Sequence, residues 1–305
     1  MQKLINYPHL ASEVFSVPHY ATRQMLDAVK AVLLPRLQGV VTAPEVMALN
    51  DAPAVPTNPG PANGSIAVIP VHGLLVSRRG QITETCMELT SYERIRSQLA
   101  IVLNDSSISE VVLDINSGGG MVAGCKELAD YIFASRDIKP ITAIVNFNAF
   151  SAAYFLASAC GTVIVSQTSG VGSIGVIMEH MEASKWEENN GLKFTTFYRG
   201  DFKNAGSPHE PITDDARTEI QEMIDNAYEM FTSSVAQYRG IDLKAVIDTQ
   251  ARCFFGQAAL DSGLADELSD PQSAINAIAA RNKPQVTTSS SVQLRATRMQ
   301  QQMQL

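Results

Sequence analysis

Apolar and polar positions change their spacing repeatedly between residues 65 and 282. Short continuous apolar runs, typical of buried strands, alternate with stretches in which apolar residues recur at helical spacing. The runs predicted as strands are Ile66–Val71, Val111–Ile115, Ile141–Val145 and Val163–Val165. The stretches predicted as helices are Tyr92–Asn104, Ala123–Ser135, Ser151–Cys160 and 212–239. This alternation predicts an α/β fold with a mostly parallel sheet that is covered on both faces.

The flanking regions have a different character and divide the chain into four parts. Residues 1–42 form a predicted N-terminal helical segment, with helical spacing over Ala21–Leu37. Seven Pro and Gly residues within 43–64 predict a linker or extended arm. The main domain spans 65–282 and closes with a helix, a strand and a further helix over 256–280. Residues 283–305 are rich in Ser, Thr and Gln, which predicts a disordered tail or the start of a scaffold segment.

Composition excludes several classes of function. The 305 residues carry a formal net charge of −8, which disfavours nucleic acid as a partner because phosphate contacts need clustered cations. No apolar stretch reaches the roughly 18 residues that a membrane helix needs, and the N-terminus lacks a signal-peptide pattern. The four cysteines form no C-x-x-C pair and no metal-ligand spacing with histidine. We therefore expect reduced thiols, no metal, no cofactor and a chain that is not secreted.

The first candidate for chemistry is a glycine run, Asn116-Ser-Gly-Gly-Gly120, which follows a predicted strand and is predicted to be a turn before the next helix. Its backbone N–H groups could stabilise an anion, either a phosphate or the oxyanion of a tetrahedral intermediate. A dinucleotide-binding fingerprint fits it only loosely, because the next strand is followed by Asn146 and not by an acid. By itself the run is equally compatible with a plain turn.

The second and third candidates are one serine and one lysine. Ser151 stands at a predicted strand-to-helix junction, where it is either an exposed hydroxyl or an ordinary N-cap. Lys203 lies in a loop bounded by Gly and Pro after the predicted strand Phe194–Tyr198, and a solvated surface lysine is the simpler interpretation there.

Taken together, these motifs resemble peptidase family S49, the signal-peptide-peptidase A family, and within it the phage head maturation or capsid assembly proteases. The resemblance covers Ser65 to about Leu268. It rests on the order of Ser117–Gly120, Ser151, the Val171-Gly-Ser173-Ile-Gly-Val176 segment and Lys203. The interval of 52 positions from Ser151 to Lys203 matches the family's spacing for a dyad carried on one chain.

The resemblance implies a ClpP/crotonase-like fold of repeated ββα units and a serine endopeptidase that works through a Ser–Lys dyad and an acyl-enzyme. It implies Ser151 as the nucleophile, Lys203 as the general base and Ser173 as the residue that orients the lysine. Gly118 and Gly119 are the implied oxyanion donors. The sequence departs from the usual pattern of the family at two places. Gly118 stands where the family usually has proline, and Ser151 is followed by two alanines where many members have two glycines.

The resemblance also implies partners. We expect protein substrates, namely phage scaffold, portal or head proteins and the chain itself, in the host cytoplasm or the procapsid interior. A homo-oligomer is expected, with an octameric ring as one candidate.

Three alternatives remain open at this stage. A bacterial signal-peptide-peptidase-like or ClpP-like enzyme is one, and the ClpP-like form would use a Ser-His-Asp triad with His180 as its candidate histidine. A crotonase-type acyl-CoA enzyme, which holds a thioester oxyanion without a Ser–Lys pair, is the second. A purely structural scaffold or assembly protein is the third.

Overall fold

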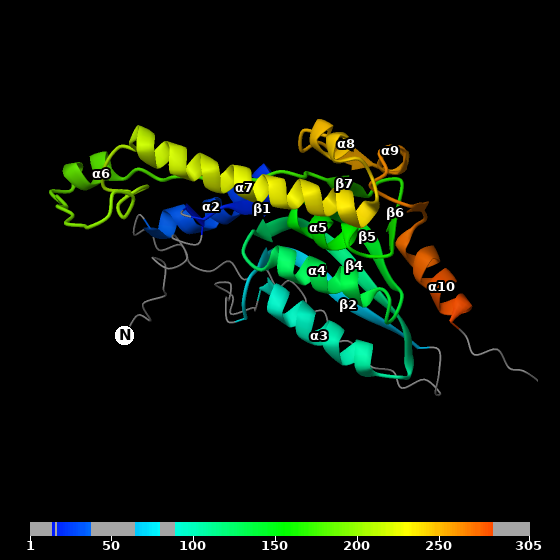
Figure 1. Cartoon of the computed structure of the whole chain (residues 1–305). Coiled ribbons are helices and arrows are strands. Elements are labelled where there is room, and N and C mark those ends of the chain that lie inside the picture. Colours follow the sequence, from blue (N-terminus) through cyan, green and yellow to red (C-terminus); the bar gives the residue numbers. More distant parts are fainter. Residues whose placement is uncertain (1–13, 16, 38–64, 80–88, 283–305) are drawn as a thin grey trace, which may run out of the picture.

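The computed structural model describes residues 14–15, 17–37, 65–79 and 89–282. The first 13 residues of the predicted N-terminal segment, the predicted linker 43–64 and the predicted tail 283–305 therefore lie outside the described residues. Within the described part, one sheet forms the centre of the molecule and helices cover both of its faces (Figure 1).

The sheet follows the order β3-β2-β4-β5-β6-β9, with β1 and β7 attached to β4 and β5 and with β8 paired to β7. Its central pairs are parallel, and only the pairs β1–β4 and β7–β8 are antiparallel. The strands are β1 His19–Ala21, β2 Ser65–Val76, β3 Thr90–Ser91, β4 Ile108–Met121, β5 Ile141–Phe150, β6 Thr162–Val165, β7 Gly170–Gly172, β8 Cys253–Phe255 and β9 Glu267–Leu268. The predicted α/β class with a mostly parallel sheet is confirmed.

Helices lie on both faces of this sheet. The helices are α2 Arg23–Leu37, α3 Tyr92–Asn104, α4 Cys125–Ser135, α5 Ala152–Ser158, α6 Ser184–Asn189, α7 Asp214–Arg239, α8 Leu243–Asp248, α9 Gln257–Asp261 and α10 Pro271–Arg281. α3, α4 and α5 bury their apolar sides against one face, and the long α7 crosses above α5 (Figure 1). α10 covers the other face by packing Ala274 and Ile278 on Val112, Ile144 and Ile164. None of the helices in the described part of the chain combines the length and the apolar character needed to cross a bilayer.

Two predicted elements were wrong. The glycine run is not a turn, because β4 continues through it to Met121 and pairs there with both β1 and β2. Residues Phe194–Tyr198 form no strand and are exposed. In both places the presence of a neighbouring strand decides whether a strand forms. The glycines form a strand because neighbouring backbones approach them closely, and the apolar residues 194–198 form none because no sheet edge in the described part of the chain lies beside them.

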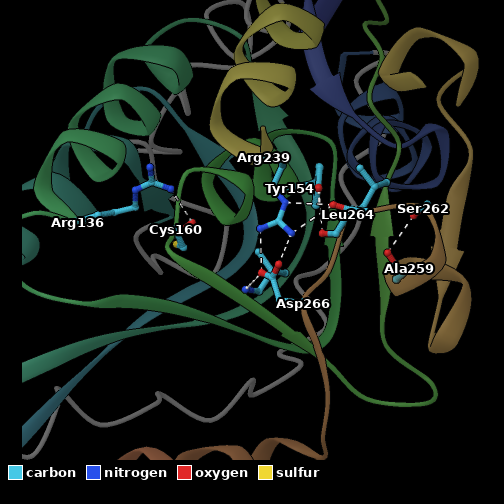
Figure 2. Close-up of polar contacts among 10 residues, drawn as sticks. Arg136, Tyr154, Cys160, Arg239, Ala259, Ser262, Leu264 and Asp266 are labelled. Atoms are coloured by element: carbon cyan, nitrogen blue, oxygen red, sulfur yellow. Dashed lines mark hydrogen bonds and ion pairs between the residues drawn. The ribbon is translucent and has the colours of Figure 1, made fainter. Parts of the chain in front are cut away.

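The end of α5 is fixed by polar contacts with the C-terminal part of the domain (Figure 2). Tyr154 donates its hydroxyl hydrogen to the carbonyl oxygen of Leu264 at 3.0 Å. Arg239, at the end of α7, pairs with Asp266 at 2.6 Å, and Asp266 also accepts from the N–H of Val163 at 2.7 Å. These contacts tie α5, α7 and β6 together, so the helix that begins after Ser151 has a fixed position.

We expect Glu110→Gln to destabilise the protein by about 2 kcal/mol, because this carboxylate, 2% exposed, anchors α10 through charge-assisted bonds. It accepts from Arg281, from Asn282 at 2.8 Å and from Thr142 at 2.9 Å. Burial raises the pKa of Glu110, but these bonds outweigh burial and the net pKa lies below its usual value. The stabilising contribution of Glu110 is therefore complete above the pKa of this carboxyl in the unfolded chain, about 4.5. It is lost as the pH falls through the lowered pKa of Glu110 in the folded protein.

Urea unfolding at neutral pH and at about pH 3 tests this expectation. The difference between the wild-type protein and the variant should shrink at the acidic pH. Glu222→Gln, on the exposed side of α7, is the matched control and should change the free energy of unfolding by less than about 0.5 kcal/mol. An equal effect of the two substitutions would contradict the anchoring role of Glu110.

Candidate active site

Ser151 occupies a strained junction between β5 and α5. Its φ is 55° and its ψ is −119°, a backbone conformation that residues other than glycine rarely adopt. It stands at the N-cap position, yet its side chain accepts no capping hydrogen bond. The N-cap interpretation therefore fails. Strain of this kind at a strand-to-helix turn is a known way to present a nucleophilic serine, and it is retained only where the surroundings enforce it.

The hydroxyl of Ser151 is buried and unsatisfied. The residue is 0% exposed, and its Oγ has no hydrogen-bond partner among the described residues. Leaving a buried hydroxyl unpaired costs about 1–3 kcal/mol, so a serine kept there without a bond indicates a role other than stability.

The segment of Ser173 lies directly beside Ser151. Phe150 pairs with Gly172 in the parallel β5–β7 ladder, and the N–H of Ser151 donates to the carbonyl oxygen of Gly172 at 2.8 Å. Ser173 follows Gly172, is half-buried and has a φ of 53°. The two serines therefore occupy neighbouring positions with positive φ, each directly after one of two adjacent strands.

The glycine run borders Ser151 on another side. A Cβ added to Gly119, whose φ is 112°, would lie 3.1 Å from the Cβ of Ser151, so these two predicted site residues are in contact. The N–H of Gly119 donates to the Oγ of Ser117 at 3.0 Å, and Ser117 donates in turn to the carbonyl oxygen of Gly73 at 2.6 Å. In this conformation the Gly119 amide is engaged, so it would have to leave Ser117 before it could bind an oxyanion. Sequence reasoning had not identified the Ser117 contact.

Gly118 is covered by the N-terminal segment. Its carbonyl oxygen accepts from the N–H of Thr22 at 2.9 Å. A Cβ added to Gly118 would meet the side chains of Thr22 and Met25 at 3.1 Å. The sequence pattern did not indicate that Thr22 and Met25 lie near the glycine run, because these two segments are about a hundred residues apart in the sequence.

Lys203 is the one predicted site residue that the fold does not bring to Ser151. It belongs to an arm, defined here as residues 178–213, which projects past the N-terminal end of α7 (Figure 1). The arm is fastened near that end: Gly206 lies against Ile220, and His180 contacts the carbonyl oxygen of Ser207 at 3.1 Å. Phe155 of α5 instead stacks on Phe231, eleven residues and about 16 Å further along α7. Lys203 itself is exposed.

The histidines of the arm serve to hold it together. His209 contacts Glu187 through Nδ1 at 2.7 Å and stacks on Phe194, with ring centroids 4.1 Å apart. Since the Oγ of Ser151 has no partner among the described residues, His180 is not its base within the chain. The geometry therefore gives no support to a Ser-His-Asp triad built on His180.

Comparison with known proteins shows which family the chain resembles. Residues 134–285 match Peptidase family S49. The chain is 34% identical over 290 residues to "Capsid assembly protease C" of Escherichia phage lambda, covering 90% of this chain and 65% of the relative. It is 40% identical over 232 residues to "Head-tail preconnector protein GP5" of Enterobacteria phage P21, covering 76% and 46%. A solved structure of the "1510-N membrane-bound stomatin-specific protease" aligns with a TM-score of 0.44 at 14% identity, covering 71% of this chain and 85% of that one.

The matched region contains the α5 helix, the Ser173 segment and the arm, which together carry the candidate chemistry. The chain belongs to peptidase family S49. It spans about two thirds of the length of the first phage relative and about half of the second.

Proposed function

We propose that this chain is a serine endopeptidase in which Ser151 is the nucleophile and Lys203 of the partner subunit is the general base. The observation that carries the proposal is the strained and buried Ser151, whose hydroxyl has no hydrogen-bond partner in the described part of the chain and which is set between Gly119 and the Ser173 segment. Family membership supports the same chemistry, and the position of the arm supports a base supplied by a second copy.

The chemistry follows from the properties of the two groups. A serine hydroxyl is a weak nucleophile and needs a base to take its proton as the Oγ attacks the peptide carbonyl carbon. A lysine is a base only when neutral, a form that burial among apolar groups favours. The protonated amine then donates to the leaving nitrogen, and water hydrolyses the acyl-enzyme ester. Backbone N–H groups of the Gly118–Gly119 segment would hold the oxyanion, a role in which one donor contributes roughly 10²–10³ in rate.

The arm has the surface that a second copy would cover. Six of its large apolar side chains are exposed, namely Trp186, Leu192, Phe194, Phe197, Tyr198 and Phe202. Phe197 is 92% exposed, and Phe202 is adjacent to Lys203. An apolar patch of this kind commonly marks an interface. Docking of the arm on the body of a neighbouring chain would bury this apolar surface and withdraw Lys203 from water. It would also bring the amine of Lys203 to Ser151 of that neighbour. Repetition of the same contact from chain to chain favours a closed ring.

The biological role is proposed from the phage relatives. The names of the two proteins refer to capsid assembly and to the head-tail preconnector. We propose that this chain processes scaffold, portal or head proteins and itself during capsid maturation, in the host cytoplasm or the procapsid interior. The ring size, with eight subunits as one candidate, is part of this proposal.

A fluorophosphonate probe tests the assignment of the nucleophile. The assembled full-length protein is incubated with the probe, and the labelled residue is mapped by mass spectrometry. We expect the label on Ser151 and none in Ser151→Ala. Ser158→Ala, which removes another fully buried serine from the same helix, is the matched control and should retain the label. A label that persists in Ser151→Ala would refute the assignment, and an unlabelled protein with acyl-CoA hydrolase activity would favour the crotonase alternative.

A further inference from the structure

The N-terminal strand β1 lies between two backbone edges beside Ser151. On one side it runs antiparallel to the glycine run of β4, with Tyr20 opposite Gly120 and Ala21 opposite Gly119. On the other side His19 and Ile177 exchange both backbone hydrogen bonds, at 2.8 and 2.9 Å. These bonds use only main-chain groups. An extended peptide of another sequence can therefore make the same contacts in the same place.

The strand lies close to the proposed nucleophile. The position where a Cβ of Gly119 would stand is 2.2 Å from the carbonyl oxygen of Tyr20 and 3.1 Å from the Cβ of Ser151. The backbone of β1 and the serine therefore meet at the same glycine. Ser151 is 0% exposed, although a peptidase nucleophile has to be reached by a peptide carbonyl. Beside this enclosed serine lies β1, an extended segment of the chain itself.

The side chain of Tyr20 fills a pocket made by the helices of the site. Its ring packs on Phe155 of α5 and Phe231 of α7, with centroids 5.6 and 4.7 Å away. Its hydroxyl donates to the carbonyl oxygen of Ala227 at 2.6 Å, and the residue is 0% exposed. The pocket thus combines an aromatic wall with one acceptor at its end, which suits a tyrosine-like side chain. Phe155 lies one turn after Ser151, so the pocket belongs to the site.

The strand is fastened to the base of the arm as well as to β4. α2 continues from β1, and its Leu26 and Leu33 pack with Ile177 and Met181. Lys30 pairs with Glu179 at 2.6 Å. The contacts of β1 and α2 are therefore made with the two segments that border Ser151 and with the base of the arm that carries Lys203.

We propose that residues 18–22 occupy the cleft in which a substrate strand binds, so that the chain is inactive until this segment leaves, and that the Tyr20 pocket then takes an aromatic side chain of the substrate. This inference rests on the proposed peptidase function. It assigns an inhibitory role to the chain's own N-terminal strand and a substrate class to the same cleft, namely extended polypeptide with an aromatic residue at the position of Tyr20.

A reversible lock tests the proposal in the full-length chain. His19→Cys and Ile177→Cys are combined in a background with Cys86→Ser and Cys253→Ser, because the other two cysteines are buried. Partners that exchange both hydrogen bonds have Cα atoms about 5.5 Å apart, within the range that a disulfide spans. The measurement is the rate at which the fluorophosphonate probe attaches to Ser151. We expect the oxidised form to react at least about a hundredfold more slowly than the reduced form, because the disulfide keeps β1 in place. Every tenfold in rate corresponds to about 1.4 kcal/mol in the free energy of releasing β1.

A release variant gives the opposite result. Tyr20→Ala removes the ring that holds β1 in its pocket and should raise the labelling rate about a hundredfold, whereas Tyr20→Phe should raise it far less. Ile278→Ala is the matched control, because it truncates a side chain buried to the same extent on the opposite face of the sheet. It should leave the labelling rate unchanged.

The outcomes separate this inference from the proposed function. Equal labelling of the oxidised and reduced lock, or equal effects of Tyr20→Ala and Ile278→Ala, overturns the inhibitory role while Ser151 remains the nucleophile. The proposed function itself fails if neither the reduced form of the lock nor Tyr20→Ala carries the label on Ser151 and if cleavage persists in Ser151→Ala. Slow labelling in the oxidised lock together with fast labelling in Tyr20→Ala supports the proposal.

Discussion

Two inactive variants should regain activity when they are assembled together. Ser151→Ala retains Lys203, and Lys203→Ala retains Ser151, so an interface in which the arm of a Ser151→Ala chain meets the serine of a Lys203→Ala chain contains a complete dyad. With random co-assembly into a ring, about a quarter of the interfaces receive the intact pair, and we expect about that fraction of wild-type peptidase activity. The expectation follows from the exposed position of Lys203 on the arm and from the Ser151 hydroxyl, which has no hydrogen-bond partner within the part of the chain that the structure describes.

The measurement is cleavage of a protein substrate by co-expressed chains, with mixed assembly verified by native mass spectrometry. Lys193→Ala, another exposed lysine of the arm, is the matched control and should remain active by itself. Lys203→Arg should be as inactive as Lys203→Ala, since arginine does not deprotonate in proteins. Mixed rings without activity would place the base on the same chain as its serine or on another residue.

Ser151→Ala should abolish cleavage while leaving the fold intact or slightly more stable. The loss in turnover is expected to reach at least about 10⁴-fold, the scale seen when one member of a catalytic unit is removed. Stability should not fall, because the Oγ of Ser151 makes no hydrogen bond among the described residues and its loss removes an unsatisfied buried polar atom.

Turnover and thermal unfolding of the same preparation check both parts of this expectation. Ser158→Ala provides the contrast: its hydroxyl donates to the carbonyl oxygen of Phe155 at 2.8 Å, so its removal should lower the melting temperature and leave turnover nearly unchanged. A Ser151→Ala protein that unfolds markedly earlier than the wild type would show that the hydroxyl has a structural role after all.

Local patterns were sufficient for most helices and for the centres of the strands. The helix Tyr92–Asn104 has the predicted bounds, and the predicted strand Ile141–Val145 is the first half of β5. The extensions of β4 and β5 were missed, since glycines and polar residues such as Asn148 carry no strand signal and become strand only through pairing with β7 and β1. The same reason explains why Phe194–Tyr198, apolar but without a neighbouring edge, is not a strand.

The order of chemical groups along the chain identified Ser151, Ser173 and the glycine run, and the fold brings these three together. No sequence signal indicated that Ser151 has a positive φ, that Ser117 engages the amide of Gly119, or that Tyr20 fills a pocket beside the nucleophile. Each of these depends on residues that are remote in sequence or on a backbone conformation enforced by such residues.

The sequence by itself determined the α/β class and the family, and it supplied the proposal for the reactive side chains, because apolar periodicity and the order of motifs are local properties of the chain. Only the tertiary structure decided that Lys203 projects on an exposed arm, that the Ser151 hydroxyl is enclosed, and that the chain's own strand His19–Ala21 pairs with the glycine run beside it. Those features arise from backbone pairing and burial between distant segments, and short-range patterns do not encode which distant edges will meet.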